Sequence, residues 1–253
     1  MKEQLYTIPL NDAINANEEC PFCFIERKVE QDLMDFVLGS GSSYMEADIR
    51  DQTDRAGFCR EHFKKMFDYG NTLGNAWILK THYKRFINEM TQEFKGYTPG
   101  KISFKNRFLH SSSNENAIKE WITKKEQSCY ICNHYKDTYA RYLDTFFYLY
   151  QQDSEFKEKV HKSKGFCLPH FGDLCEGADC RLSDKEKDEF YRVLLPLMTE
   201  NLERIAEDVA WMVEKFDYRN KDADWKNSKD AIQRGMQKLK GGYPADGPYK
   251  MSK

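Results

Sequence analysis

The chain has 253 residues, of which 40% are hydrophobic and 32% charged, and its formal net charge is -2. Nearly balanced charge argues against nucleic acid or an anionic membrane as a partner, because such binding normally needs an excess of Lys and Arg on one face. No run of about eighteen apolar residues occurs, so we expect no membrane-spanning segment. The composition is typical of a globular protein with a large supply of aromatic core residues.

The N-terminal residues 1–10 lack the apolar run of a signal peptide. We therefore expect the protein to be cytoplasmic. In that reducing compartment the eight cysteines are expected to serve as metal ligands or redox groups, and they are too few for a disulfide-rich scaffold in a chain of this length.

The first half of the chain predicts two helices with a marked stripe of apolar residues. One follows Cys23 and ends at the Gly- and Ser-rich residues 39–43. Its apolar positions are Val29, Leu33, Phe36 and Val37. The other ends near Lys95, and its apolar positions are Ala76, Trp77, Tyr83, Ile87, Met90 and Phe94. A polar connector, residues 96–116, follows, and its one candidate for extended structure is Lys101–Lys105.

The second half repeats the helical pattern. A helix is predicted after Cys132, with apolar positions Tyr135, Tyr139, Tyr142, Phe146 and Leu149, and a softer break at residues 151–154. Ser183 and Glu186 have the spacing of a capping box, which predicts the start of a long helix. The apolar stripe of that helix is Leu202, Ile205, Val209, Met212 and Phe216. Pro196 should kink this helix or divide it in two.

After Tyr218 the density of apolar residues falls, apart from a short amphipathic segment with Ala231, Ile232, Met236 and Leu239. Beyond Gly241 and Gly242 we expect a disordered tail. The predicted fold is therefore all-α, with two tandem helical repeats and long C-terminal helices. The predicted segments are a first repeat at residues 1–95, the connector at 96–116, a second repeat at 117–217 and a C-terminal tail with a short helix at 218–253.

An internal repeat of metal-binding motifs is the most informative feature of the sequence. Each copy has a CxxC pair followed by a GFCxxHF motif, and the interval from the second to the third cysteine is 36 residues in the first copy and 35 in the second. The first copy supplies Cys20, Cys23, Cys59 and His62, and the second supplies Cys129, Cys132, Cys167 and His170. Three thiolates and one imidazole make a complete tetrahedral shell for zinc.

We predict one zinc ion per copy, hence two per chain, each joining a CxxC at one helix start to the CxxH at another helix start of the same copy. Such an ion would close a long loop and contribute to the free energy of folding. Iron or an iron–sulfur cluster is the less favoured occupant, because the histidine-containing shell is typical of structural zinc. Simple burial of these cysteines and histidines is the other alternative, although packing alone would tolerate Ala, Val or Leu at the same positions.

Several further residues of metal-binding type lie outside the two motifs. Cys175 and Cys180 could provide a replacement ligand, a redox pair or merely small side chains. Glu26, three residues after Cys23, could form a hydrogen bond behind the metal, and we favour a solvated carboxylate because its counterpart is Tyr135. The remaining histidines are expected on the surface or in packing contacts, and they are His82, His110, His134 and His161.

These motifs resemble an uncharacterised bacterial family of helical proteins that carry CPxC followed by GFCxxH, usually twice. The resemblance covers most of the chain, including residues 69–74 and 225–231 beside the motifs, and Tyr130 departs from it because the family pattern has proline there. Some members are labelled as substrate-binding components of transporters. This chain lacks the secretion signal and the alternating α/β pattern that such a component needs. The resemblance therefore implies no established activity.

The sequence predicts a zinc-stabilised interaction or regulatory module, with a protein partner that the sequence does not identify. No catalytic or organic cofactor-binding residue is assigned, because four protein ligands per ion leave no open position and no phosphate loop, nucleophile elbow or HExxH is present. One alternative is a thiol-based redox or metal-responsive switch. The other is an enzyme with a pocket between the two repeats.

Overall fold

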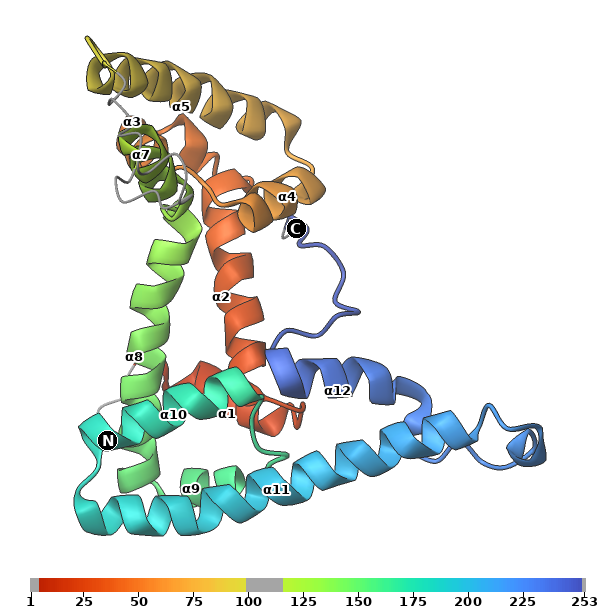
Figure 1. Ribbon diagram of the computed structural model, residues 1–253. Coiled ribbons are helices and arrows are strands. Elements are labelled where there is room, and N and C mark those ends of the chain that lie inside the picture. Colours follow the sequence, from red (N-terminus) through yellow and green to blue (C-terminus); the bar gives the residue numbers. More distant parts are fainter. Residues whose placement is uncertain (1–4, 99–115, 252–253) are drawn as a thin grey trace, which may run out of the picture. The chain divides into compact units, whose positions relative to one another are not determined.

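The computed structural model describes residues 5–98 and 116–251, and every regular element in those two stretches is a helix (Figure 1). The prediction of an all-α protein is therefore confirmed for the described residues. The possible extended segment Lys101–Lys105 and His110 lie outside them. The helices are α1 Thr7–Asn15, α2 Pro21–Leu38, α3 Ala47–Ala56, α4 Arg60–Tyr69, α5 Thr72–Glu93, α7 Ala117–Glu126, α8 Tyr130–Gln152, α9 Ser154–His161, α10 Leu168–Arg181, α11 Asp184–Glu214 and α12 Ala231–Lys240. Short 3₁₀ turns lie at Ser43–Met45, Tyr218–Asn220 and Ser228–Asp230.

The chain forms two compact units, and each unit combines two separate stretches of sequence. The first unit contains Met1–Val29 and Asp137–Gly247, and the second contains Glu30–Lys136 and Pro248–Lys253. The unit boundaries consequently fall inside α2 and α8. The division into four consecutive segments that we expected from the sequence stays a prediction.

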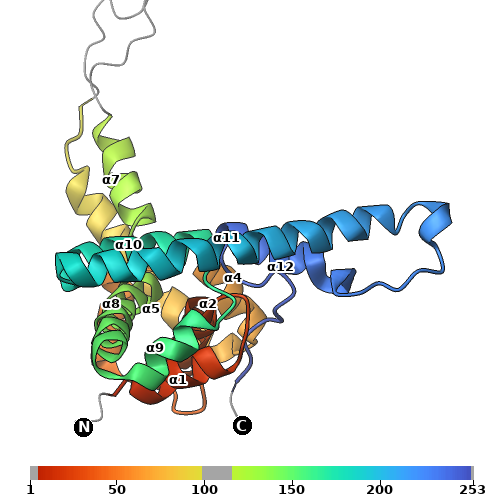
Figure 2. The same ribbon diagram turned by 90° about the horizontal axis from the view of Figure 1, so that it is seen from below.

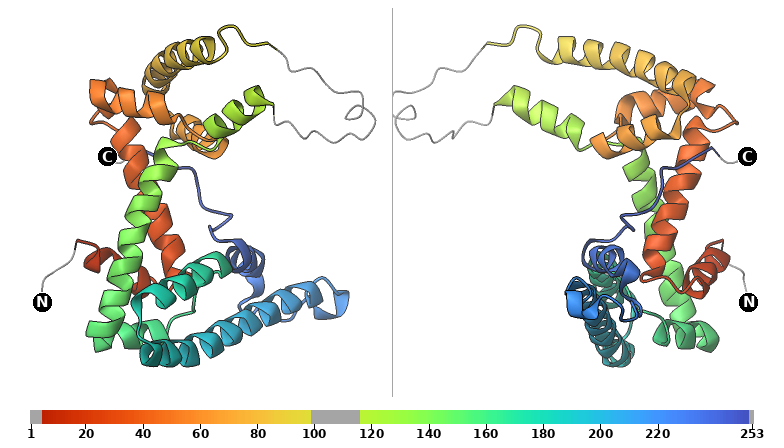
Figure 3. Two further views of the ribbon diagram at one scale, coloured as in Figure 1. Left: turned by 60° about the vertical axis from the view of Figure 1, so that its left-hand side comes forward. Right: turned by 90° about the vertical axis from the view of Figure 1, so that its right-hand side faces the viewer.

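The second unit packs α3, α4 and α5 around the C-terminal half of α2 and the first turns of α8. Its buried cluster is Met34, Val37, Leu38, Tyr44, Phe58, Met66, Tyr69, Ile78, Cys129, Tyr130 and Ile131. Helices α5 and α7 lie side by side (Figure 3), where Trp121 contacts Phe86 and Phe94 with ring centroids 5.2 and 5.5 Å apart. Asn71 caps α5 by accepting a hydrogen bond from the amide of Gly74.

The first unit has a core made largely of aromatic rings. Its fully buried phenylalanines are Phe22, Phe146, Phe147, Phe156, Phe166 and Phe190. Of the apolar positions predicted after Cys132, Tyr142, Phe146 and Leu149 are buried in this unit. Helices α11 and α12 run alongside each other in this unit (Figure 2).

The predicted capping box at the start of α11 is present, because Ser183 and Glu186 satisfy each other's backbone amides. Pro196 does not divide the helix, which runs without interruption from Asp184 to Glu214. Pro196 is exposed, whereas Leu194, Leu197 and Met198 beside it are buried. Because proline has no amide hydrogen, the backbone carbonyl four residues before Pro196 receives no helical hydrogen bond. This carbonyl lies on the solvent side of the helix, and the packing of the opposite side holds the helix together.

The C-terminal segment differs from the disordered tail that we expected. Tyr249 packs against the buried cluster of the second unit, and its hydroxyl donates a 2.6 Å hydrogen bond to Glu30. The side chain of Gln31 also donates to the carbonyl of Lys250, at 2.9 Å. None of the described helices is both long and apolar enough to cross a membrane.

Candidate metal centres

All eight predicted ligands lie at helix starts. Cys20 and Cys129 each come immediately before a helix, α2 and α8, and the second cysteine of each pair lies in the first helical turn. Cys59 and Cys167 are the N-caps of α4 and α10. The histidine of each CxxH follows in the first turn. Free backbone amides and the positive end of the helix dipole favour thiolate at these positions.

The glycine of each GFC motif has a conformational role. Gly57 and Gly165 have φ angles of +62° and +71°, in a region that residues with a Cβ rarely adopt. The carbonyl of Gly57 also accepts a 2.9 Å hydrogen bond from the amide of Tyr130, which ties this loop to the second CxxC. Tyr130 therefore makes a contact that the proline of the family pattern could not make, since proline has no amide hydrogen.

One group of ligands, the Cys20 centre, consists of Cys20, Cys23, Cys167 and His170. The Sγ of Cys167 lies 3.7 Å from the Sγ atoms of both Cys20 and Cys23. Nδ1 of His170 lies 3.1 to 3.6 Å from the three sulfurs. All four residues are buried.

The other group, the Cys59 centre, consists of Cys59, His62, Cys129 and Cys132. Nδ1 of His62 lies 3.2, 3.3 and 3.4 Å from the sulfurs of Cys59, Cys129 and Cys132. The Sγ atoms of Cys59 and Cys132 are 3.9 Å apart. Each of the two groups, with ligand atoms within 4.8 Å of one another, could hold a metal ion.

The predicted pairing of motifs within each copy is wrong. Each centre takes its CxxC from one copy and its CxxH from the other. Helix α2 has 18 residues, so it carries the chain about 27 Å along its axis from the region of Cys23. Helix α3, which comes before Cys59, has 10 residues and is only about 15 Å long, too short to bring the chain back over that distance. Equal spacing in sequence therefore does not bring the two motifs of one copy together.

A buried carboxylate lies behind the histidine of the Cys59 centre. Oε1 of Glu30 is 3.2 Å from Nε2 of His62, the ring nitrogen that faces away from the sulfurs. Glu30 also accepts hydrogen bonds from Lys65 and Tyr249. Although burial alone would raise the pKa of Glu30, the hydrogen bonds from His62, Lys65 and Tyr249 lower it to about 2. The ionised carboxylate holds the ring with Nδ1 directed at the three sulfurs.

The thiol and imidazole groups of this centre also stabilise each other's charged forms. Burial opposes charge on His62, but its hydrogen bonds to Cys129 and Glu30 raise its pKa to about 10. Burial likewise opposes ionisation of Cys129, and the hydrogen bond from His62 lowers its pKa to about 6. A metal ion bound at Nδ1 would displace that proton, so binding is coupled to proton release.

The residues around the Cys20 centre are different. Glu26 lies 4.0 Å from Nε2 of His170 and is about one-third exposed. The carboxylate of Glu26 is therefore partly solvated, and it lies at the limit of ion-pair distance from the histidine. The ring of Tyr139 lies 5.6 Å from that of His170, and its hydroxyl donates to Asp173.

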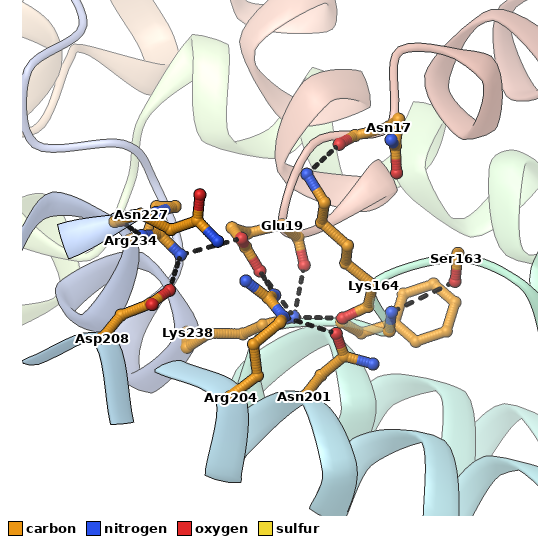
Figure 4. A network of polar contacts seen from close by, with 12 residues as sticks. Asn17, Glu19, Ser163, Lys164, Asn201, Arg204, Asp208, Asn227, Arg234 and Lys238 are labelled. Carbon is orange, nitrogen blue, oxygen red and sulfur yellow. Dashed lines mark hydrogen bonds and ion pairs between the residues drawn. The ribbon is translucent and has the colours of Figure 1, made fainter. Parts of the chain in front are cut away.

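A buried polar network stands beside this centre (Figure 4). The ammonium group of Lys238 donates to the carbonyl of Glu19 at 2.6 Å and to the carbonyl of Lys164. The carboxylate of Glu19 pairs with Arg204 at 2.5 Å. Arg234 forms a 2.9 Å ion pair with Asp208 at the edge of the same network.

The remaining cysteines and histidines of the described stretches lie outside both groups. Cys175 is partly buried and Cys180 is exposed, and both lie on α10. Five positions on an α-helix turn the side chains about 140° apart, so a disulfide between these two would require α10 to unwind. His82 binds the carbonyl of Asp54, and His161 contacts the hydroxyl of Tyr150. His134 packs against the ring of Tyr130.

Sequence reasoning missed Glu30, Lys238 and Tyr249. Glu30 gave a usable signal, since it lies seven residues, or two helical turns, after Cys23. Nothing in the local sequence marks Lys238 or Tyr249, because their roles arise from contacts with residues about 219 positions away.

A family model described as a family of unknown function, DUF6062, matches residues 1–246. Comparison with curated proteins found no match, and comparison with solved structures found none either.

Proposed function

The chain belongs to DUF6062, a family of unknown function, and we propose that it is a zinc-stabilised helical protein in which two ions hold helix starts together. Family membership brings no activity with it, so the proposal rests on the chemistry of the two centres. Each ion would join the CxxC of one sequence half to the CxxH of the other.

The spacing of the ligand atoms is the observation that carries this proposal. With bonds of about 2.3 Å to sulfur and 2.0 Å to nitrogen, a tetrahedral ion places sulfurs about 3.8 Å apart and the nitrogen about 3.5 Å from each sulfur. The Sγ to Sγ distances of 3.7 to 3.9 Å fit that shell. A disulfide would need about 2.05 Å. All four positions are protein ligands, which favours a structural role over a catalytic one.

Zinc is favoured over an iron–sulfur cluster. In such a cluster the cysteines bind different iron atoms, so their sulfurs lie farther apart than ligands of a single ion. Here all four ligand atoms lie within 4.8 Å of one another. A single ion with thiolate and imidazole ligands in tetrahedral positions is the usual environment of zinc.

We also propose that the two halves derive from one duplicated unit. The positions seven residues after each CxxC support this, since Glu30 and Tyr139 correspond in the repeat. Glu30 contacts His62, and Tyr139 packs against His170. Corresponding residues therefore lie beside the histidine in both centres, although one is a carboxylate and the other an aromatic ring.

The proposed role of this metal-stabilised scaffold is to present a surface to a protein partner in the cytoplasm. Tyr83, Ile87 and Met90 project from α5 at helical spacing, and each is about half exposed or more. Ile232, Met236 and Leu239 do the same on α12. A hollow of about 400 Å³ at the end of α12 is lined by Met236, Leu239, Lys240, Gly241, Gly242, Tyr243 and Pro244. None of the eight cysteines forms a disulfide, which agrees with a reducing compartment.

Metal analysis of protein purified without oxygen tests the central claim. We expect two zinc ions per chain, one ion in each of the single variants Cys59→Ser and Cys167→Ser, and loss of helical structure when a strong chelator removes both ions. Cys180→Ser is the control, because this exposed cysteine lies outside both centres and its replacement should leave two ions bound. Freshly purified protein without bound metal would contradict the proposal.

A further inference from the structure

The two centres differ in how well they are shielded from solvent. In the Cys20 centre the exposed fraction is 0% for Cys20, 2% for Cys23 and 0% for Cys167. In the Cys59 centre, Cys59 and Cys132 are only partly buried. Two cysteines of the Cys59 centre are therefore partly exposed to solvent, whereas every cysteine of the Cys20 centre is buried.

The shielding of the Cys20 centre comes from the end of α12. Gly241 has a φ of +76°, and a Cβ on this residue would lie 3.6 Å from the sulfur of Cys167 and 3.9 Å from that of Cys23. Any side chain at this position would therefore be in van der Waals contact with the two sulfurs, which places Gly241 directly beside them. No other glycine in the described residues has a ligand sulfur among its nearest neighbours.

Lys238 holds this cover in place. Its ammonium group is buried, with the whole residue 1% exposed, and it binds the carbonyls of Glu19 and Lys164 (Figure 4). Glu19 immediately precedes the first CxxC, and Lys164 immediately precedes the second GFCxxHF motif. One lysine therefore fixes α12 to both chain segments that deliver ligands to the Cys20 centre.

We propose that the Cys59 centre is a hydroperoxide-sensitive metal site, whereas the Cys20 centre keeps its ion as a structural site. This inference rests on the proposed binding of two zinc ions. It assigns the chemical sensitivity to Cys59 and Cys132, whose sulfurs are 3.9 Å apart and come from the starts of different helices, α4 and α8.

The reaction needs one hydrogen peroxide molecule. The thiolate of one of these two cysteines attacks a peroxide oxygen, an S–O bond forms, the O–O bond breaks, and the departing hydroxide takes up a proton to become water. The thiolate of the other cysteine then attacks the sulfur of the sulfenic acid, and the S–O bond breaks as the disulfide forms. The second hydroxide also takes up a proton. Two thiolates are oxidised by two electrons, and peroxide is reduced to two water molecules.

Formation of the disulfide leaves only Cys129 and His62 as ligands. Two ligands cannot complete a tetrahedral shell, so the ion is released from the Cys59 centre. The Cys20 centre retains its four ligands under Gly241 and Lys238. The protein would then pass from two bound ions to one.

The experiment treats the zinc-loaded protein, carrying Cys180→Ser to remove the exposed thiol, with increasing hydrogen peroxide. Released zinc is followed with a chromogenic chelator, and peptide mass spectrometry identifies disulfides after free thiols are blocked. We expect one ion to be released together with a Cys59–Cys132 disulfide, and the second ion to leave at least about tenfold more slowly. The additional variant Lys238→Met should speed release of the second ion and leave release of the first unchanged.

Release of both ions at one rate, earlier oxidation of the Cys20 centre, or retention of both ions under peroxide would overturn the inference and leave the proposed zinc binding intact. Absence of zinc from the untreated protein would overturn both. If Lys238→Met does not fold, the comparison of the two release rates in the Cys180→Ser protein still decides the matter.

Discussion

The sulfurs of Cys23 and Cys167 lie 3.7 Å apart although 144 positions separate them in the sequence. Cys23 and Cys59, only 36 positions apart, belong to different centres. The motif repeat therefore crosses over in three dimensions, and a metal ion at each centre would close a loop that runs from one sequence half into the other. Loop-closure entropy rises with loop length, so such ions constrain the unfolded chain more than ions bound within each half would.

Metal counting in double variants tests this crossed pairing. Cys23→Ser with Cys167→Ser removes two ligands from one centre, so the protein should keep one ion. Cys23→Ser with Cys59→Ser damages both centres, and the protein should lose both ions. Elemental analysis of the purified variants measures the number of bound ions. If the Cys23/Cys167 variant lost both ions and the Cys23/Cys59 variant kept one, the ligands would instead pair within each copy.

The main helices and the eight residues that form the two candidate metal groups could be predicted from the sequence, whereas the way these residues pair in space could not. Apolar spacing identified α2, α5, α8 and α11, and Ser183 with Glu186 marked the start of α11 correctly. Local periodicity and capping depend on neighbours within a few residues, so the sequence records them directly. The short helices α1, α3, α7 and α9 carry weaker stripes and were not predicted.

The pairing of the cysteines and histidines depends on where the intervening helices end. The number of residues between two motifs does not reveal those ends. The roles of Lys238 and Tyr249 depend likewise on contacts with Glu19 and Glu30. Pro196 shows the reverse case, because the local signal predicted a kink or a division of the helix, and the helix continues undivided beside the buried Leu197 and Met198. Tertiary packing decided each of these points.

Glu30 should strengthen metal binding at the Cys59 centre. Glu30→Gln keeps the size of the side chain and removes the charge that orients His62, so we expect affinity at this centre to fall on the order of 10- to 100-fold. Glu26→Gln is the matched control, because Glu26 is 4.0 Å from His170 and more exposed. Chelator competition should show two unequal sites in Glu30→Gln and a much smaller change in Glu26→Gln. Equal effects of the two substitutions would argue against a specific role for Glu30.

Replacing either of two glycines on α10 by alanine should change the free energy of unfolding, in opposite directions for the two positions. A Cβ at Gly177 would lie 2.6 Å from Cε2 of the buried Phe147, whereas a Cβ at Gly172 would meet nothing within 4 Å. Gly177→Ala should lower the free energy of unfolding by about 1 to 3 kcal/mol through overpacking. Gly172→Ala should raise it by about 0.5 to 1 kcal/mol, because alanine loses less entropy in a helix. Urea unfolding of both variants measures the difference, and destabilisation by Gly172→Ala would show that the surroundings of α10 are tighter than described.

The contact between His161 and Tyr150 should make the stability of the first unit depend on pH. The hydroxyl of Tyr150 lies 2.8 Å from Nε2 of His161. Burial raises the pKa of Tyr150 to about 12, so the phenol keeps its proton and donates it to a neutral imidazole. Burial, followed by the charge of Lys157, lowers the pKa of His161 below its ordinary value.

Because the folded state disfavours the protonated form of His161, the unfolded chain binds a proton first as pH falls. The stabilisation is therefore complete above the ordinary histidine pKa of about 6.5 and is lost progressively below it, until the lower pKa of the folded state is reached. His161→Gln retains an acceptor for Tyr150 but cannot take up the proton. Urea unfolding between pH 7.5 and 5.5 should show a smaller loss of stability in this variant than in the parent protein. Equal losses would mean that His161 titrates alike in the folded and unfolded chain.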